Sequence, residues 1–142
     1  MSGFDIGKIV EQDEFSAWVP FIEGIKVKIK HIPREELLAL RKKAVQVNFD
    51  RRTHQKNEQY DAITGAVILG QAAIQDWEGL QSNGQPFPCT PENIEILMRK
   101  WADFARFVDE TCTDLVALME AEMESERKNS GSTSGLASST EG

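Results

Sequence analysis

Three side chains that could ligate a metal ion recur at a regular spacing in the first half of the chain. Asp50, His54 and Glu58 are each four residues apart, which on a helix would place one imidazole and two carboxylates on the same face. One histidine with two carboxylates in a basic, polar stretch is a weak set of ligands. We therefore expect no metal and no cofactor at these residues, but a solvated start of a helix.

The cysteines do not belong to a recognisable catalytic set. Cys89 stands between Pro88 and Thr90, and Cys112 lies on an apolar stripe, so we expect both thiols to pack as small apolar groups. The sequence contains no phosphate-binding loop, no dinucleotide fingerprint, no GxSxG and no zinc-ligand spacing. It therefore predicts a protein that is not an enzyme, without catalytic residues.

The charges are distributed unevenly. The 142 residues include 16 Lys and Arg against 23 Asp and Glu, a net charge of −7. Residues 26–56 hold ten basic and three acidic side chains, whereas residues 103–126 hold one basic and eight acidic ones. We expect one soluble domain with a basic and an acidic region, which are either solvated or dock onto a partner or onto each other in a homo-oligomer.

The apolar segments predict a protein that stays in the cytoplasm and does not contact a membrane. The longest uncharged apolar stretch, residues 62–75, is too short to cross a bilayer. Asp5 and Glu11 interrupt the amino-terminal segment where a signal peptide needs a continuous apolar run. Two cysteines do not form a disulfide framework, in agreement with a reducing compartment such as the cytoplasm of a bacterial host.

Residues 15–32 predict a β-hairpin. Apolar residues and lysines alternate over residues 25–30, the period of a strand with one buried face. Glu23 and Gly24 would form the turn, and Pro20 would place the first strand at an edge. Two strands are not stable by themselves, so this hairpin must pack on helices.

Helical spacing predicts three or four helices after the hairpin, and hence an α+β fold that is mainly α-helical. The helices cover about residues 33–47, 58–77 and 91–126. Thr90 would cap the last of them, with Pro91 at its first position. A single helix over 91–126 would be about 50 Å long, so we expect a break near residues 101–103.

The chain divides into three parts on composition. Residues 1–14 form a short leader, residues 15–127 a single globular domain, and residues 128–142 a tail rich in Gly, Ser and Thr. Such a tail cannot offset its ordering entropy by burial, so we expect it to be disordered. Residues 49–56, between the first two helices, are polar and predict a loop.

The last helical region carries an apolar stripe that is broad for a small monomer. Two interpretations remain open: the helix is held from two sides within its own domain, or part of the stripe is an intermolecular seam. On the second interpretation the partner-binding candidates are Trp101, Phe104, Phe107 and Leu118.

Five basic residues are further candidates for partner binding. They are Arg41, Lys42, Lys43, Arg51 and Arg52. With Lys56 they make a local basic patch, and phosphate contacts of this number could support salt-sensitive binding of nucleic acid. Because the chain as a whole is acidic and has no known reading element, we expect these residues to be solvated or to face an acidic protein surface instead.

The order of several short phrases carries a resemblance. The phrases are WVP at 18–20, IKVKI at 25–29, EEL at 35–37, RKKA at 41–44, DWEGL at 76–80, TPENI at 90–94 and LMRKW at 97–101. Over about residues 15–120 the chain resembles small tail assembly chaperones of tailed bacteriophages and prophages. The matching positions are scaffold: Trp77 would lie on the buried face of the second helix, and Gly79 would end it in a left-handed conformation.

The resemblance implies a role without enzymatic activity or cofactor. Such chaperones hold the tape measure protein, a very long helical chain, and help tail tube subunits assemble around it. Some also exist in a longer form made by ribosomal frameshifting. An apolar groove with charged rims would suit an amphipathic client. Two alternatives remain: a tail structural, completion or adaptor protein, and a small nucleic-acid-associated regulator acting through residues 41–56.

Overall fold

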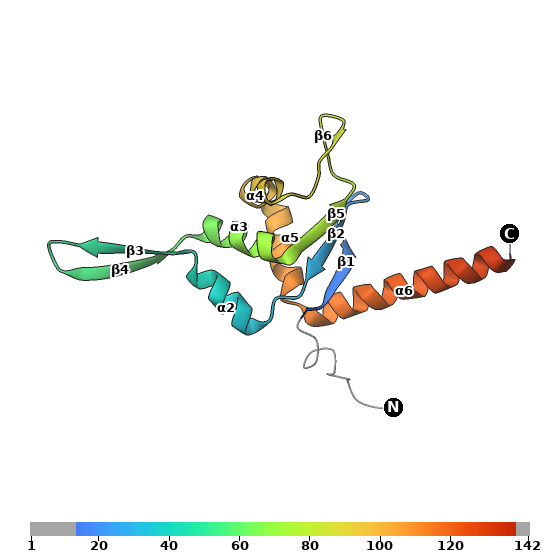
Figure 1. Cartoon of the computed structure of the whole chain (residues 1–142), viewed down its shortest axis with the longest axis horizontal. Helices are drawn as coiled ribbons and strands as arrows, with labels where there is room; N and C mark the ends of the chain where they lie inside the picture. The colour runs from blue at the N-terminus through green and yellow to red at the C-terminus, as the bar shows by residue number, and fades with distance from the viewer. Residues whose placement is uncertain (1–13, 139–142) are drawn as a thin grey trace, which may run out of the picture.

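The structure is a computed structural model that describes residues 14–138, with side chains up to residue 128. Most of the predicted leader lies outside the described residues. The elements are β1 (Ser16–Pro20), β2 (Lys26–Lys30), α2 (Arg34–Lys42), β3 (Val45–Asp50), β4 (Gln55–Tyr60), α3 (Ala62–Ala73), β5 (Ile74–Glu78), β6 (Gln81–Ser82), β7 (Gln85–Pro86), α4 (Pro91–Lys100), α5 (Ala102–Cys112) and α6 (Leu115–Ser138). The prediction of a mixed, mainly helical fold is confirmed, but the described residues form five helices, α2 to α6, where three or four were expected (Figure 1).

The predicted amino-terminal hairpin is confirmed as β1 and β2. Glu23 and Gly24 have φ angles of 47° and 81°, as expected for the tight turn that matches the twist of two antiparallel strands. β1 lies at the edge of the sheet, in the order β1-β2-β5, so Pro20 is at an edge as expected. The side chains of Val27 and Ile29 are fully buried beneath the helices.

The third strand of this sheet corrects the second predicted helix, which was expected over residues 58–77. The helix α3 ends at Ala73, and β5 pairs antiparallel with β2. The pairing shifts register between Lys28 and Ile29, because Gln75 is an extra residue in β5. This bulge places Ile74 and Trp77 on the same buried face three residues apart, a spacing that imitates a helix.

The first predicted helix, over 33–47, is also too long. α2 ends at Lys42, and the chain then forms a second hairpin from β3 and β4, where a polar loop was expected. We call this β3–β4 hairpin the arm, residues 45–60. It projects from the body at the opposite end from α6 (Figure 1). Its two strands make their main contacts with each other.

The helical region predicted over residues 91–126 is interrupted twice, once at the expected position and once further along the chain. Trp101 separates α4 from α5 in an extended conformation, which confirms the break near 101–103. A second break follows α5, where the carboxylate of Asp114 accepts a hydrogen bond from Ala117 N at 3.0 Å and so caps α6. α6 continues to Ser138, so residues 128–138 are helical where the composition predicts disorder, and residues 139–142 lie outside the described range.

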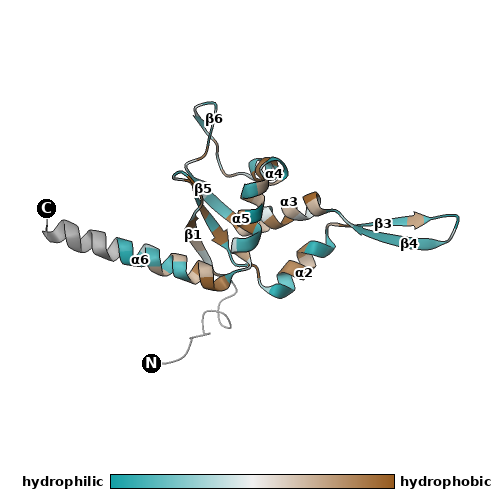
Figure 2. Ribbon diagram, turned by 180° about the vertical axis from the view of Figure 1, so that it is seen from behind, coloured by the Kyte–Doolittle hydropathy of each residue, from teal (hydrophilic) through white to brown (hydrophobic). Residues whose placement is uncertain are grey.

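The core lies between the three-stranded sheet and the helices α3 and α5. α3 and α5 pack on β2, and α6 packs along β1. The largest fully buried side chains include Ile29, Phe104 and Val108. Figure 2 shows hydrophobic segments on the sheet and on α3, whereas most of the arm is hydrophilic. No helix in the described part of the chain combines the length and the apolar character needed to cross a bilayer.

Candidate partner-binding surface

The four apolar candidates belong to the core and not to an open seam. Phe104 and Leu118 are fully buried. Trp101 and Phe107 are half-buried around the ring of Phe21, with ring centroids at 5.3 and 4.7 Å. Of the two interpretations left open by the sequence, a helix held within its own domain describes these residues. Phe21 contacts the other three aromatic rings, and Leu118 of α6 belongs to the same core cluster.

The five basic candidates are exposed, but they do not form one patch. Arg41 and Lys42 end α2 and Lys43 follows, so these three lie at the root of the arm. Arg51 and Arg52 lie in the turn at its tip. Strands of six residues separate the two groups by about 20 Å. The acidic side chains of Asp50 and Glu58 lie on the arm between these two groups, so the surface has mixed charge.

The pairing register gives the two faces of the arm different chemistry. On one face, Val45 pairs with Tyr60, Val47 with Glu58, and Phe49 with Lys56. The side chains of Val47 and Phe49 are 59% and 57% exposed. The alternate residues form the other face: Gln46, Asn48, Asp50, Gln55, Asn57 and Gln59. One face is therefore apolar with two charges, and the other consists almost entirely of amides. We call Val45, Val47, Phe49 and Tyr60 the apolar row.

The register also corrects the metal-like spacing of the sequence. Asp50 and Glu58 lie on opposite faces of a ribbon and not on one helical face. The carboxylate of Asp50 accepts a hydrogen bond from Arg52 N at 2.8 Å, and the ring of His54 contacts Phe49 with a centroid distance of 6.3 Å. These residues shape the tip of the arm. Among the residues that the structure describes, no three His, Cys, Asp or Glu side chains are grouped as metal ligands.

Asp61 joins the arm to the body. Its carboxylate accepts hydrogen bonds from Ile63 N and Thr64 N, each at 3.1 Å, and so caps α3. The same side chain accepts a hydrogen bond from Gln46 at 3.4 Å, and its backbone N–H donates to the carbonyl of buried Ala44 at 3.0 Å. The hydrogen bond from Thr64 N is the main reason why the pKa of Asp61 is lowered. One ionised residue thus fixes the end of β4 and the start of α3.

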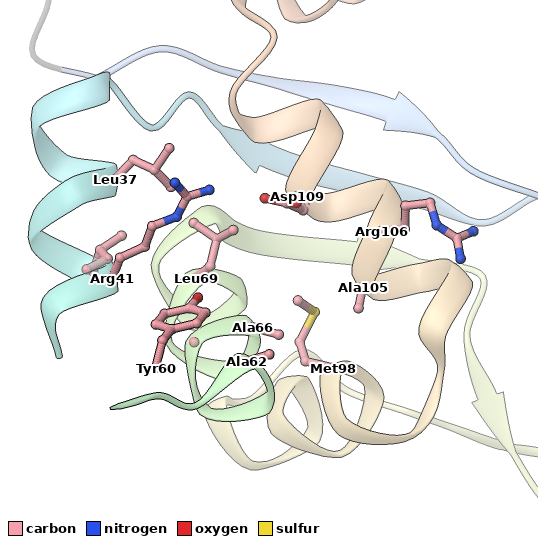
Figure 3. Close-up of a pocket in the computed structure, with 12 residues that line it drawn as sticks. Leu37, Arg41, Tyr60, Ala62, Ala66, Leu69, Met98, Ala105, Arg106 and Asp109 are labelled. Atoms are coloured by element: carbon pink, nitrogen blue, oxygen red, sulfur yellow. The ribbon is translucent and has the colours of Figure 1, made fainter. Parts of the chain in front are cut away.

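A cavity of about 330 Å³ opens beside the root of the arm, between α2, α3, α4 and α5 (Figure 3). Leu37 and Arg41 reach it from α2, Leu69 from α3 and Met98 from α4. The full lining is Leu37, Leu40, Arg41, Tyr60, Ala62, Gly65, Ala66, Leu69, Met98, Ala105, Arg106 and Asp109. The small residues of α3 and α5 leave this space, because an alanine or glycine does not fill the gap between helices.

Tyr60 connects the cavity to the arm. It is the last residue of β4, belongs to the apolar row, and forms one wall of the cavity. Its ring lies over Gly65, where an added Cβ would come within 2.7 Å of the ring carbon Cζ. Glycine at position 65 therefore lets the tyrosine reach α3. The apolar surface thus continues from Phe49 at the tip to Leu69 in the cavity.

Opposite charges lie at the rim of the cavity. Figure 3 shows Arg41 extending from α2 toward the side where Asp109 projects from α5, whereas Arg106 points away. Arg106 pairs with Asp103 at 2.9 Å. Neither Arg41 nor Asp109 forms an ion pair within 4.0 Å with any residue in the described range. Both charges are thus available to a bound molecule.

The two thiols are placed as the sequence predicts. Cys112 is fully buried and Cys89 is half-buried. Burial, with a smaller contribution from the carboxylate of Asp109, raises the pKa of Cys112 to about 12. Burial, with Asp76, raises the pKa of Cys89 to about 11. Both groups are therefore protonated near neutral pH, which does not suit a nucleophile.

The apolar row and the cavity were not predicted from the sequence. The alternation of Val45, Val47 and Phe49 was a signal for a strand, but helical spacing up to Val47 obscured it. The cavity left no local signal, because its residues come from five separate elements.

The surface described above lies on a mixed α+β protein with a projecting two-stranded arm. A family profile for YdaY prophage proteins matches residues 34–129, a range that includes the whole arm and every residue that lines the cavity. The chain therefore belongs to the YdaY prophage protein family. No curated protein and no solved structure matches the chain.

Proposed function

We propose that this prophage protein is a non-enzymatic tail assembly chaperone. It binds the tape measure protein, the tail tube protein or both while the tail is assembled in the cytoplasm of the host. The order of the sequence phrases between residues 15 and 120 supports this role, and membership of a prophage protein family agrees with it.

The observation that carries the proposal is the exposed apolar row of the arm. Val47, Phe49 and Tyr60 keep 59%, 57% and 48% of their surface exposed on a ribbon that leaves the body. A two-stranded ribbon is only marginally stable in water. Exposing large apolar side chains on such a ribbon to water is unfavourable as well. A protein partner that covers this face would stabilise the arm and bury the row.

This surface suits temporary binding. The row and the neighbouring cavity are small compared with the interfaces of permanent complexes, and small interfaces are typical of transient ones. The chaperone would cover an apolar segment of its client until tube subunits displace it. The client contacts proposed here lie on the arm and the cavity, since the aromatic residues of α5 belong to the core.

The other two candidates have less support. A regulator that binds nucleic acid needs a continuous basic surface, but the arm separates Arg41 from Arg51 and carries Asp50 and Glu58 in between. A tail completion or adaptor protein would use the same apolar surface but would stay in the finished particle. The location of the protein after assembly distinguishes that alternative from a chaperone.

The test is affinity purification of the tagged full chain from cells in which the prophage is induced, in low and in high salt. We expect mass spectrometry to find the tape measure or tail tube protein with it, and purified particles to lack it. Recovery of nucleic acid that is lost in high salt would favour the regulator. Presence of the chain in mature particles would favour a structural component.

A further inference from the structure

We infer that the cavity beside Tyr60 takes one large apolar side chain from an amphipathic helix of the client, and that the apolar row of the arm contacts the next turns of the same helix. The inference deepens the proposed function and rests on it, because that function supplies a helical protein as partner.

The walls of the cavity favour an apolar side chain over a polar small molecule. Leu37, Leu69, Met98 and Ala105 provide much of the lining, and the charged groups lie at the rim. A site for a small metabolite needs polar groups that converge on its functional atoms. A volume of about 330 Å³ is also at the lower end of the range of about 300–1,000 Å³ for such sites.

The continuity of the surface favours a helix over a short ligand. From Val45 to Phe49 the apolar row extends about 13 Å along β3. That length equals between two and three turns of an α-helix, since one turn rises about 5.4 Å. A helix with apolar residues at positions i, i+4, i+7 and i+11, which span about 16.5 Å, would place one side chain in the cavity and the others on the row.

The charged residues beside the cavity and the apolar row indicate which kind of helix would bind there. Arg41 and Asp109 lie at the rim of the cavity, and Lys56 and Glu58 lie on the same face of the arm as Phe49 and Val47. Each pair consists of one basic and one acidic residue. A helix with acidic and basic residues on both sides of its apolar stripe would pair with these charges. A polyanion would be repelled by the carboxylates of Glu58 and Asp109.

The test fills the cavity with a side chain of the protein itself. Ala105 lines the cavity, whereas Ala102, three residues earlier on α5, is exposed and does not line it. The full chain is co-expressed with the tape measure protein and the tail tube protein of the same prophage. We expect Ala105→Trp to lower the amount of captured client at least tenfold and Ala102→Trp to leave it within twofold of the wild type.

A second filling variant covers the case in which Ala105→Trp does not fold. Ala62 lies at the exposed start of α3 and also lines the cavity, so Ala62→Trp should fold and should lower capture in the same way. Thermal unfolding shows which variants keep the fold. Capture at wild-type level by a folded filling variant would overturn the anchor site and leave the chaperone proposal standing. Failure of the wild type to capture either protein would overturn the proposed function itself.

Discussion

Gly79 shows how one residue lets the end of β5 approach the turn of the β1–β2 hairpin. Its φ angle is +86°, a left-handed conformation that only glycine adopts at low cost. The sequence predicted this conformation, but at the end of a helix. In the structure Gly79 follows β5, and a Cβ there would lie 2.7 Å from the carbonyl oxygen of Gly24. The glycine therefore permits both the turn and the close approach of the β1–β2 hairpin.

Substitution of Gly79 separates these two roles. Gly84 has a similar φ angle of +78°, but a Cβ there would meet no atom within 4 Å. Gly84→Ala should cost only the conformational strain, whereas Gly79→Ala should cost about 1–3 kcal/mol more because backbone atoms must move. Urea denaturation measures both free energies of unfolding. Equal losses in the two variants would show that the contact with Gly24 does not constrain the fold.

The raised pKa values of the thiols predict slow alkylation and disulfide exchange. At pH 8 little thiolate is present at Cys89, whose pKa is about 11, and less at Cys112, whose pKa is about 12. We expect both to react with a disulfide reagent about tenfold or more slowly than a free cysteine, and the rate at Cys89 to rise with pH toward 11. Rapid reaction of either thiol in the folded protein at pH 8 would contradict the burial that raises the pKa.

At the scale of elements, the sequence predicted what local signals control. The turn at Gly24, the cap at Thr90 and the extended break at Trp101 each depend on the residues beside them. Among the strands that were not predicted, β5 and β4 were missed for different physical reasons. In β5, the extra residue Gln75 places the buried residues three positions apart. That spacing is typical of a helix and not of the alternation in a strand. In β4, all six residues are polar or exposed, so pairing with β3 defines the strand and no apolar pattern marks it.

Thr90 offers a direct test of a confirmed cap. Its hydroxyl oxygen accepts a hydrogen bond from Asn93 N at 3.1 Å at the start of α4. We expect Thr90→Ala to lower the free energy of unfolding by about 1 kcal/mol, since the first turn loses an acceptor, and Thr90→Ser to restore most of it. Chemical denaturation followed by circular dichroism measures both. An unchanged stability in Thr90→Ala would show that water satisfies the N–H equally well.

At the scale of the whole molecule, a packed body holds an arm that presents chemistry of its own. The family match includes this arm and the cavity but begins after the β1–β2 hairpin. The sequence identified the basic residues at the root and tip of the arm, but the assembly of the cavity from α2, α3, α4, α5 and Tyr60 depends on tertiary packing. The apolar stripe in the sequence could not show whether that side of α5 packs in the core or binds a partner.

The proposed function requires that one face of the arm binds the client, and alternate residues of β3 test this requirement. Val47 and Phe49 lie on the apolar face, whereas Gln46 and Asn48 lie on the amide face of the same strand. The measurement is capture of the tape measure and tail tube proteins by two variants that each add one negative charge to β3. We expect at least a tenfold loss for Phe49→Asp and near wild-type capture for Asn48→Asp, whose side chain lies on the amide face. Equal capture by the two variants would contradict it.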